Sequence, residues 1–308
     1  IAEAALPKIG DFEPQNLSNL AWAFATLAED ARDLCLAVAG MASAKVSEFM
    51  PQGLSNLAWA FATLGVGDLE LCEAITSESV VKAHGFKPQE VGNIIWAYAK
   101  LRVDDLHMVR AFSKEAVMQI RSFKAQELSN IVWAFATVDM SDPELFDMVV
   151  DQAMQRVVDF APQALSGIAW AFASCGRYEA KLFQVIAEDA VSKVVFFKPQ
   201  ELSNIVWAFS KASIDDGALF AAVSADAIGK LSEFAPQHLS NVVWAFATLC
   251  FDDQDLCSAI VAETQMKLQG FNLQGLSNTA WAFATLPVKE PEIFNAIAEV
   301  LVVELDFF

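Results

Sequence analysis

The sequence has few basic residues, with 20 Lys and Arg against 39 Asp and Glu and a formal net charge of −19. A charge of this sign is repelled by a phosphate backbone, so it argues against a protein that binds nucleic acid by charge alone. Charged residues of both signs make up only 19% of the chain, whereas hydrophobic residues make up 55%. Disorder is therefore excluded, because so much apolar surface must be buried.

The sequence also lacks a long uninterrupted hydrophobic run, metal-ligand spacings and a catalytic pattern. A membrane-spanning helix needs about 18 apolar residues in a row, and the longest stretches here, such as 242–251, are far shorter. Five cysteines are too few for a disulfide framework, and no nucleophile has a recognisable base partner. We therefore expect a soluble or peripheral protein of a reducing compartment that is not an enzyme and has no metal or cofactor.

The tryptophans are evenly spaced. Every gap between neighbours is 37 residues, and the residue ten positions before each Trp is always Phe. The tryptophans are Trp22, Trp59, Trp96, Trp133, Trp170, Trp207, Trp244 and Trp281. A fixed period of this length is typical of a tandem-repeat protein. We divide the chain into eight repeats, 13–49, 50–86, 87–123, 124–160, 161–197, 198–234, 235–271 and 272–308. Residues 1–12 are interpreted as the end of a preceding repeat, which predicts a segment of a longer array.

Each repeat is expected to contain two helices. The first begins with Pro in most repeats, as in PQNLSNLAWAFATL from Pro14. The second follows a turn that ends in an acidic residue, which stabilises the start of a helix. These acids are Asp68, Asp105, Asp142, Glu179, Asp216, Asp253 and Glu290, and Ala31 takes their place in the first repeat.

The second helix has one apolar face, which includes Cys35, Val38 and Ala42 at helical spacing. A two-helix unit cannot bury this face alone, so the repeats must stack. We predict an all-α protein, an α-solenoid of eight tandem 37-residue two-helix repeats in a right-handed superhelical stack. The cysteines on the apolar face are interpreted as core residues.

A stripe of amides and aromatic rings runs along the first helix. Gln15, Asn19 and Trp22 lie opposite its apolar side, so with two helical layers they face the concave surface. Gln recurs in all eight repeats and Asn in seven, with Gly167 as the exception. The candidate binding residues are Gln15, Asn19, Gln52, Asn56, Gln89, Asn93, Gln126, Asn130, Gln163, Gln200, Asn204, Gln237, Asn241, Gln274 and Asn278.

Two interpretations of this stripe stay open. Amides can bond base edges or peptide groups and rings can stack on bases, which suits an extended polymer. Residues identical in every repeat can equally belong to the stacking interface, with Trp wedged between repeats. Residues that are the same in every repeat cannot distinguish one base from another. Sequence specificity would therefore depend on the position that follows the Gln, which varies between repeats. Glu at this position is also an ordinary helix-capping residue. That position holds Asn16, Gly53, Glu90, Glu127, Ala164, Glu201, His238 and Gly275.

A row of basic residues lies near the end of the second helix. After Lys8, its candidate members are Lys45, Lys82, Arg156, Lys193, Lys230 and Lys267, with Gln119 as an interruption and Glu304 at the end. A basic row at repeat spacing could track a phosphate chain. Four of its members also follow an acid by four residues, at Glu78, Asp189, Asp226 and Glu263, which is the order of a helical surface ion pair. Both interpretations stay open.

These repeats resemble those of the heptatricopeptide repeat family of apicomplexans and dinoflagellates and are similar to the algal octotricopeptide repeats. The resemblance rests on PQ-x-LSN-x-x-WAFATL at the start of each unit and covers residues 13–308. It implies an α-solenoid that binds RNA in mitochondria or plastids, with the first helices as the RNA-facing surface.

Two hypotheses follow. The first is a non-enzymatic organellar protein that holds single-stranded RNA or ribosomal RNA fragments along the concave first-helix surface, with binding that weakens with salt. The second is an acidic protein–protein scaffold in a large assembly, such as a ribosome or a photosynthetic or respiratory complex. The two differ in whether nuclease treatment releases the partner.

Overall fold

The computed structural model describes residues 2–27, 32–101, 103, 105–286 and 291–305. Within these ranges the chain forms seventeen α-helices, eight short 3₁₀-helices and no strand, and successive helices pack as in a solenoid. The prediction of an all-α solenoid is confirmed, while the right-handed sense of the stack stays a prediction. The chain divides into two compact units, Ile1–Gln152 and Ala153–Phe308.

The first helices of the repeats begin every 37 residues. They are α2 (Pro14–Leu27), α4 (Pro51–Leu64), α6 (Pro88–Leu101), α8 (Ala125–Thr137), α10 (Pro162–Ser174), α12 (Pro199–Lys211), α14 (Pro236–Thr248) and α16 (Leu273–Thr285). Pro occupies the first helical position in six of them, where its missing N–H is not needed and its fixed φ suits the helix.

The second helices each lead into a 3₁₀-helix where the following residues are described. The second helices are α3 (Arg32–Ala44), α5 (Leu69–Val81), α7 (Leu106–Gln119), α9 (Pro143–Arg156), α11 (Ala180–Lys193), α13 (Gly217–Ile228), α15 (Gln254–Lys267) and α17 (Pro291–Leu305). The 3₁₀-helices are η1 (Leu6–Asp11), η2 (Val46–Glu48), η3 (Ala83–Gly85), η4 (Ile120–Ser122), η5 (Val157–Asp159), η6 (Val194–Phe196), η7 (Leu231–Glu233) and η8 (Leu268–Gly270). The short α1 (Ala2–Ala5) precedes η1.

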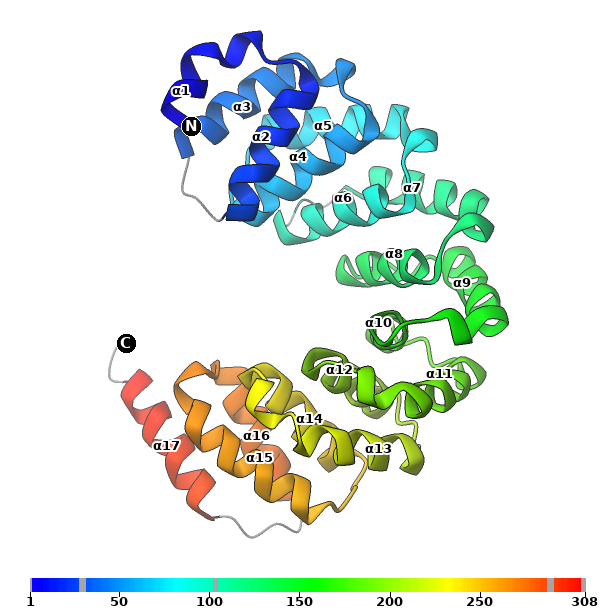
Figure 1. Cartoon of the computed structure of the whole chain (residues 1–308), viewed down its shortest axis with the longest axis vertical. Helices are drawn as coiled ribbons and strands as arrows, with labels where there is room; N and C mark the ends of the chain where they lie inside the picture. Colours follow the sequence, from blue (N-terminus) through cyan, green and yellow to red (C-terminus); the bar gives the residue numbers. More distant parts are fainter. Residues whose placement is uncertain (1, 28–31, 102, 104, 287–290, 306–308) are drawn as a thin grey trace. The chain divides into compact units, whose positions relative to one another are not determined.

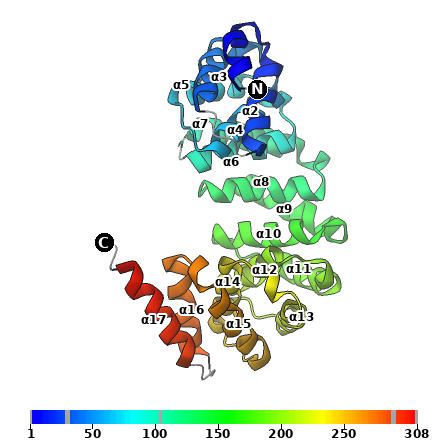
Figure 2. The same cartoon turned by 60° about the vertical axis from the view of Figure 1, so that its left-hand side comes forward.

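Within each unit the helices form two layers (Figure 1). In the first unit α2, α4, α6 and α8 pack side by side along much of their length, whereas α3, α5 and α7 touch one another over much less. The second unit repeats this arrangement, with α10, α12, α14 and α16 packed closely (Figure 2). The close approach rests on small side chains such as Ala60, Ala97 and Ala171, each fully buried at 0% exposure.

The periodic phenylalanines form part of the core between the layers. Those from Phe49 to Phe271 each end a 3₁₀-helix with an extended backbone and a buried ring, whereas the ring of Phe12 is half-buried. Cys35 and Cys257 are also buried, as the sequence predicts for core residues. Burial raises the pKa of the Cys257 thiol to about 11, so this cysteine is a protonated core residue at neutral pH.

The predicted acidic caps of the second helices are present in five cases. A carboxylate oxygen accepts a hydrogen bond of 2.9–3.1 Å from the backbone N–H three residues later at Asp68, Asp105, Asp142, Asp216 and Asp253. Glu179 is an exception, because its longer side chain accepts from Arg177 at 3.3 Å instead of capping the helix. Ala31 and Glu290 lie outside the described residues.

Five of the first helices are followed by a residue with a left-handed backbone, and only two of these residues are glycine. Gly65 and Gly176 have positive φ, as expected for a helix C-terminus, but Asp139, Ser213 and Cys250 adopt φ of 54–57° at the equivalent position. At all five positions the next backbone N–H donates to a carbonyl five residues earlier, at 2.9–3.0 Å. This bond holds non-glycine residues in a conformation that costs about 1–2 kcal/mol each.

Candidate functional site

The amide stripe lies on the surface of the first-helix layer in each unit. Its glutamine side chains are exposed except at Gln126, which is half-buried, and Asn19 is its one exposed asparagine. The other asparagines are half-buried, and Asn130 lies beside Gly92 of the preceding first helix. The Nε2 of Gln126 donates to the Oδ1 of Asn130 at 2.9 Å. The stripe therefore presents one accessible Gln amide and one partly covered Asn amide in most repeats.

The tryptophans of the stripe stack on one another. In the first unit the ring centroids of Trp22 and Trp59 lie 6.4 Å apart, and those of Trp59 and Trp96 lie 6.5 Å apart. In the second unit the ring of Trp207 lies 6.1 Å from Trp170 and 6.5 Å from Trp244. The rings are half-buried along the rows and 47–48% exposed at Trp22 and Trp281. Tryptophan thus joins neighbouring first helices and still leaves part of its ring accessible.

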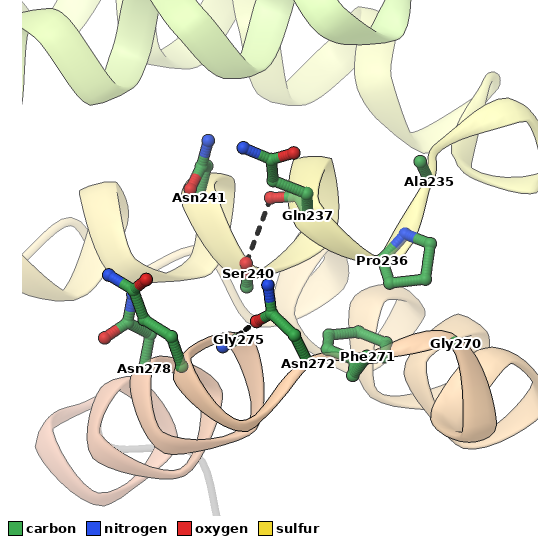
Figure 3. Close-up of a pocket in the computed structure, with 11 residues that line it drawn as sticks. Ala235, Pro236, Gln237, Ser240, Asn241, Gly270, Phe271, Asn272, Gly275 and Asn278 are labelled. Atoms are coloured by element: carbon green, nitrogen blue, oxygen red, sulfur yellow. Dashed lines mark hydrogen bonds between the residues drawn. The ribbon is translucent and has the colours of Figure 1, made fainter. Parts of the chain in front are cut away.

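A pocket of about 390 Å³ opens on this face between α14 and α16 of the second unit. Figure 3 shows the amides of Gln237 and Asn241 side by side on α14, with Asn278 across from them on α16. The pocket is lined by Ala235, Pro236, Gln237, Ser240, Asn241, Gly270, Phe271, Asn272, Gln274, Gly275 and Asn278. Four of these belong to the predicted amide stripe, so the structure brings amides of neighbouring repeats around one cavity.

Two glycines leave the pocket room. A Cβ at Gly270 would lie 3.1 Å from Cγ of Pro236, and a Cβ at Gly275 would lie 3.2 Å from Oδ1 of Asn272. The same Asn272 oxygen accepts the backbone N–H of Gly275 at 2.7 Å and so caps α16. Since larger side chains would crowd these contacts, the pocket depends on glycine at both positions.

The first-helix layer is nearly free of charge. Of the 39 acidic and 20 basic residues in the chain, the eight first helices hold three acids and two bases. These five residues are Glu90, Lys100, Glu127, Glu201 and Lys211. No charged residue lines the pocket between α14 and α16. The negative charge of the chain therefore resides on the second helices and the connections. Counting the charges at each repeat position would have predicted this separation from the sequence.

The variable position beside the stripe is used mainly for helix capping. Glu90, Glu127 and Glu201 each accept a hydrogen bond from the backbone N–H three residues earlier, at 2.6–2.9 Å. His238 accepts from the N–H of Ala235 through Nδ1 at 3.2 Å. Burial, together with the positive charge of Lys267, lowers the pKa of His238, and a neutral ring can accept this bond. The capping role predicted for Glu at this position is confirmed.

The basic row has a structural role. Lys230 donates to the carbonyl oxygens of Val195 and Phe197 at 3.1 and 2.9 Å and pairs with Asp226 at 2.6 Å. Lys82, Lys193 and Lys267 make the same bonds to the preceding repeat, at 2.7–3.0 Å, and pair with the predicted acids at 2.6–2.8 Å. Lys45 bonds the carbonyls of Gly10 and Phe12. An ammonium group has three donors, so most of these lysines have none left for a phosphate.

We call this set of contacts the lysine clamp, meaning a lysine that bonds the end of the preceding 3₁₀-helix and an acid of its own helix. The four predicted ion pairs are confirmed, but the sequence did not show the carbonyl acceptors. They lie 33 and 35 residues earlier, so they come together only when repeats stack. We therefore leave the basic row out of the proposed binding surface.

The interruption of the row at Gln119 makes a direct test of the clamp possible. Gln119 bonds Glu115 of its own helix at 2.5 Å, and Glu115 occupies the acid position of the clamp. Gln119→Lys should bond the end of η3 and pair with Glu115, raising the free energy of unfolding of the first unit by about 1 kcal/mol. Urea denaturation followed by circular dichroism measures this change. A neutral or destabilising result would show that the clamp geometry differs at this junction.

Two lysines lie on the first helices, where the sequence had not predicted a basic side chain beside the stripe. The Nζ of Lys100 lies 5.0 Å from the ring centroid of Trp96, which is a cation–π contact. Lys211 occupies the equivalent position after Trp207 and is exposed. Most other repeats have Thr there, and Thr137 and Thr248 donate to the carbonyl of the Trp four residues earlier. Only a comparison of repeats position by position would have singled these lysines out.

The comparisons with known proteins agree with a helical-repeat family. Residues 3–224 match the family model described as RNA-editing substrate-binding complex 6 protein. The chain belongs to this family. The curated proteins contain no significant match. A structure similar to this chain is a homology model of the full-length AP-3 complex in an intermediate open conformation, with 14% identity over 94% of this chain and a TM-score of 0.34. The chain spans about half, 51%, of that protein's chain, and a likeness this weak carries no argument.

The described residues show neither a membrane-spanning helix nor a metal-binding cluster. In that part of the chain, no helix is long and apolar enough to cross a membrane. The described residues also contain no group of three or more His, Cys, Asp or Glu side chains that could hold a metal ion.

Proposed function

We propose that this protein holds single-stranded RNA along the first-helix face, as a non-enzymatic component of a mitochondrion or plastid. The observation that carries the proposal is the neutral face of amides and partly exposed tryptophans, repeated from helix to helix in both units. Base edges bond to amides, and bases stack on indole rings with about 1–3 kcal/mol per base. Membership of a family named for an RNA-editing complex supports the RNA assignment. The family resemblance of the repeats suggests ribosomal RNA fragments as one class of target.

The net charge of −19 is compatible with this proposal because of where the charge lies. Thirty-six of the 39 acids lie on the second helices and the connections, and packed helices are about 8–10 Å apart. The Debye length at physiological ionic strength is about 8 Å, so the acids on the far side of the second layer are largely screened at the first-helix face. Repulsion of the RNA backbone is therefore weaker at this face than the total charge indicates.

Replacing amides of the second unit tests the proposal. We expect a variant with Gln200→Ala, Asn204→Ala, Gln237→Ala and Asn241→Ala to bind a fluorescein-labelled single-stranded RNA at least about tenfold more weakly. Each lost hydrogen bond contributes about 0.5–1.5 kcal/mol, and about 1.4 kcal/mol corresponds to a tenfold change. Fluorescence anisotropy at a fixed salt concentration measures the affinity.

The matched control removes amides from second helices. Gln265 lies exposed on α15 and Asn295 lies exposed on α17. The variant Gln265→Ala with Asn295→Ala should bind RNA as the original protein does. If the control and the first-helix variant lose affinity equally, or if the original protein binds no single strand, the proposal is wrong.

The acidic second-helix layer favours a second candidate function, a protein–protein scaffold in a large assembly. Thirty-six of the 39 acids lie outside the first helices, and those that neither cap a helix nor pair with a lysine are available to a basic partner. The two candidates differ in purification from native extract. A partner that stays bound after nuclease treatment and leaves at high salt supports the scaffold, whereas a partner lost on nuclease treatment supports RNA.

A further inference from the structure

The first-helix face offers a bound strand very few cations. Four lysines of the basic row are committed to the lysine clamp, in which Lys82, Lys193 and Lys230 each satisfy three acceptors. On the first helices themselves the two basic residues are Lys100 and Lys211. The first helices themselves therefore supply one cation in each unit, and the exposed Lys87, Lys124 and Lys198 precede three of these helices.

The face also offers few groups that could distinguish one base from another. The amides and indoles are the same in nearly every repeat, so they present the same donors and acceptors to each nucleotide. At the variable position, the Glu and His side chains bond their own helix start. Gly53, Ala164 and Gly275 have no polar side-chain atom there. Asn16 alone keeps an exposed amide at this position.

We infer that the first-helix face binds unpaired RNA through its bases, without selecting their order and with almost no contribution from phosphate neutralisation. This inference rests on the proposed function and specifies its mode. The amides bond whichever base edge is presented, and the indole rings accept any base face. The protein thus holds many different single strands, and its affinity changes little with salt concentration. The hypothesis of RNA binding drawn from the sequence instead expects binding that weakens with salt.

The salt dependence of the affinity distinguishes binding through the bases from binding through phosphate contacts. The slope of log affinity against log salt is about −0.7 per phosphate contact on a single strand. Two contacts, at Lys100 and Lys211, would give a slope of about −1.4, whereas the six members of the basic row would give about −4. The double variant Lys100→Thr with Lys211→Thr restores the residue that most other repeats have and should bring the slope close to zero.

The experiment is a titration of the whole chain with labelled 20-nucleotide oligo(U), oligo(A), oligo(C) and one mixed sequence, at several salt concentrations between 50 and 200 mM. We expect the four affinities to agree within about fivefold, a margin set by differences in stacking strength. We expect the slope to be no steeper than about −1.4. Glu201→Ala should leave the ratio of the four affinities unchanged, because Glu201 caps its helix and does not contact a base.

The outcomes are distinct. Preference for one strand by more than about tenfold, a slope near −4, or a change of preference in the Glu201 variant overturns this inference while leaving RNA binding in place. Binding of all four strands with a shallow slope supports it. If none of the strands binds even at 50 mM salt, the proposed function itself is wrong, and the amide face then belongs to a polypeptide partner.

Discussion

Phe197→Ala should lower the free energy of unfolding of the second unit by about 3–5 kcal/mol, the usual range for a buried Phe reduced to Ala. The Phe197 ring is only 3% exposed, and the residue ends η6 where one repeat meets the next. Removing the ring leaves a cavity in the core that the surrounding helices cannot fill completely. Urea denaturation followed by circular dichroism measures the loss.

The neighbouring residue provides the control. Phe196 has the same side chain but is 72% exposed, so Phe196→Ala should change the free energy of unfolding by less than about 0.5 kcal/mol. The two variants remove the same atoms from adjacent positions and therefore differ only in burial. Equal effects of the two variants would contradict the packing described for this repeat junction.

Lys230→Met should lower the free energy of unfolding of the second unit by about 2–3 kcal/mol. Methionine keeps the length of the side chain but removes the bonds to the carbonyls of Val195 and Phe197 and the ion pair with Asp226. The carboxylate of Asp226 is only 13% exposed, so it would be left partly desolvated without its partner. Losing one member of such a charged network costs more than losing an exposed ion pair.

A lysine of the same unit serves as the control for this change. Lys181 is exposed on α11, and Lys181→Met should alter stability by less than about 0.5 kcal/mol. Hydrogen exchange of the backbone amides gives a second measurement, because the Lys230 variant should loosen η6 and α13 before the rest of the unit. If both lysine variants behave alike, the clamp contributes nothing beyond surface charge.

The sequence predicted well those features that depend on local spacing. These features are the first-helix starts, the Asp caps at positions such as Asp216 and the ion pair between Asp226 and Lys230. Each of them depends on residues no more than four apart along the chain. Such contacts follow from helix geometry alone. The left-handed ends at Ser213 and Cys250 were missed, because neither residue type marks that conformation in a sequence.

The placement of the amides on the first-helix surface was predicted from the sequence, but the cavity between them was not. Gln237 and Asn241 lie on the predicted side of their helix and line one cavity with Asn278. That cavity also needs Gly270 at the end of the same repeat and Gly275 in the next repeat. The tryptophans were predicted to be either wedged between repeats or exposed. The structure shows rings such as that of Trp207 in contact with those of neighbouring repeats and still only half-buried. These properties depend on the distance between neighbouring first helices, which no local pattern specifies.

The chain has only 20 basic residues against 39 acids, and the stacking of the repeats decides where these few basic residues are used. The sequence by itself determined the 37-residue period, the two helices of each repeat and their apolar faces, because these depend on spacing along the chain. Only the tertiary structure decided that most lysines of the basic row bond the preceding repeat and that a nearly uncharged amide face remains. The physical reason is that both features arise from contacts between repeats, whose side chains lie more than thirty residues apart in the sequence.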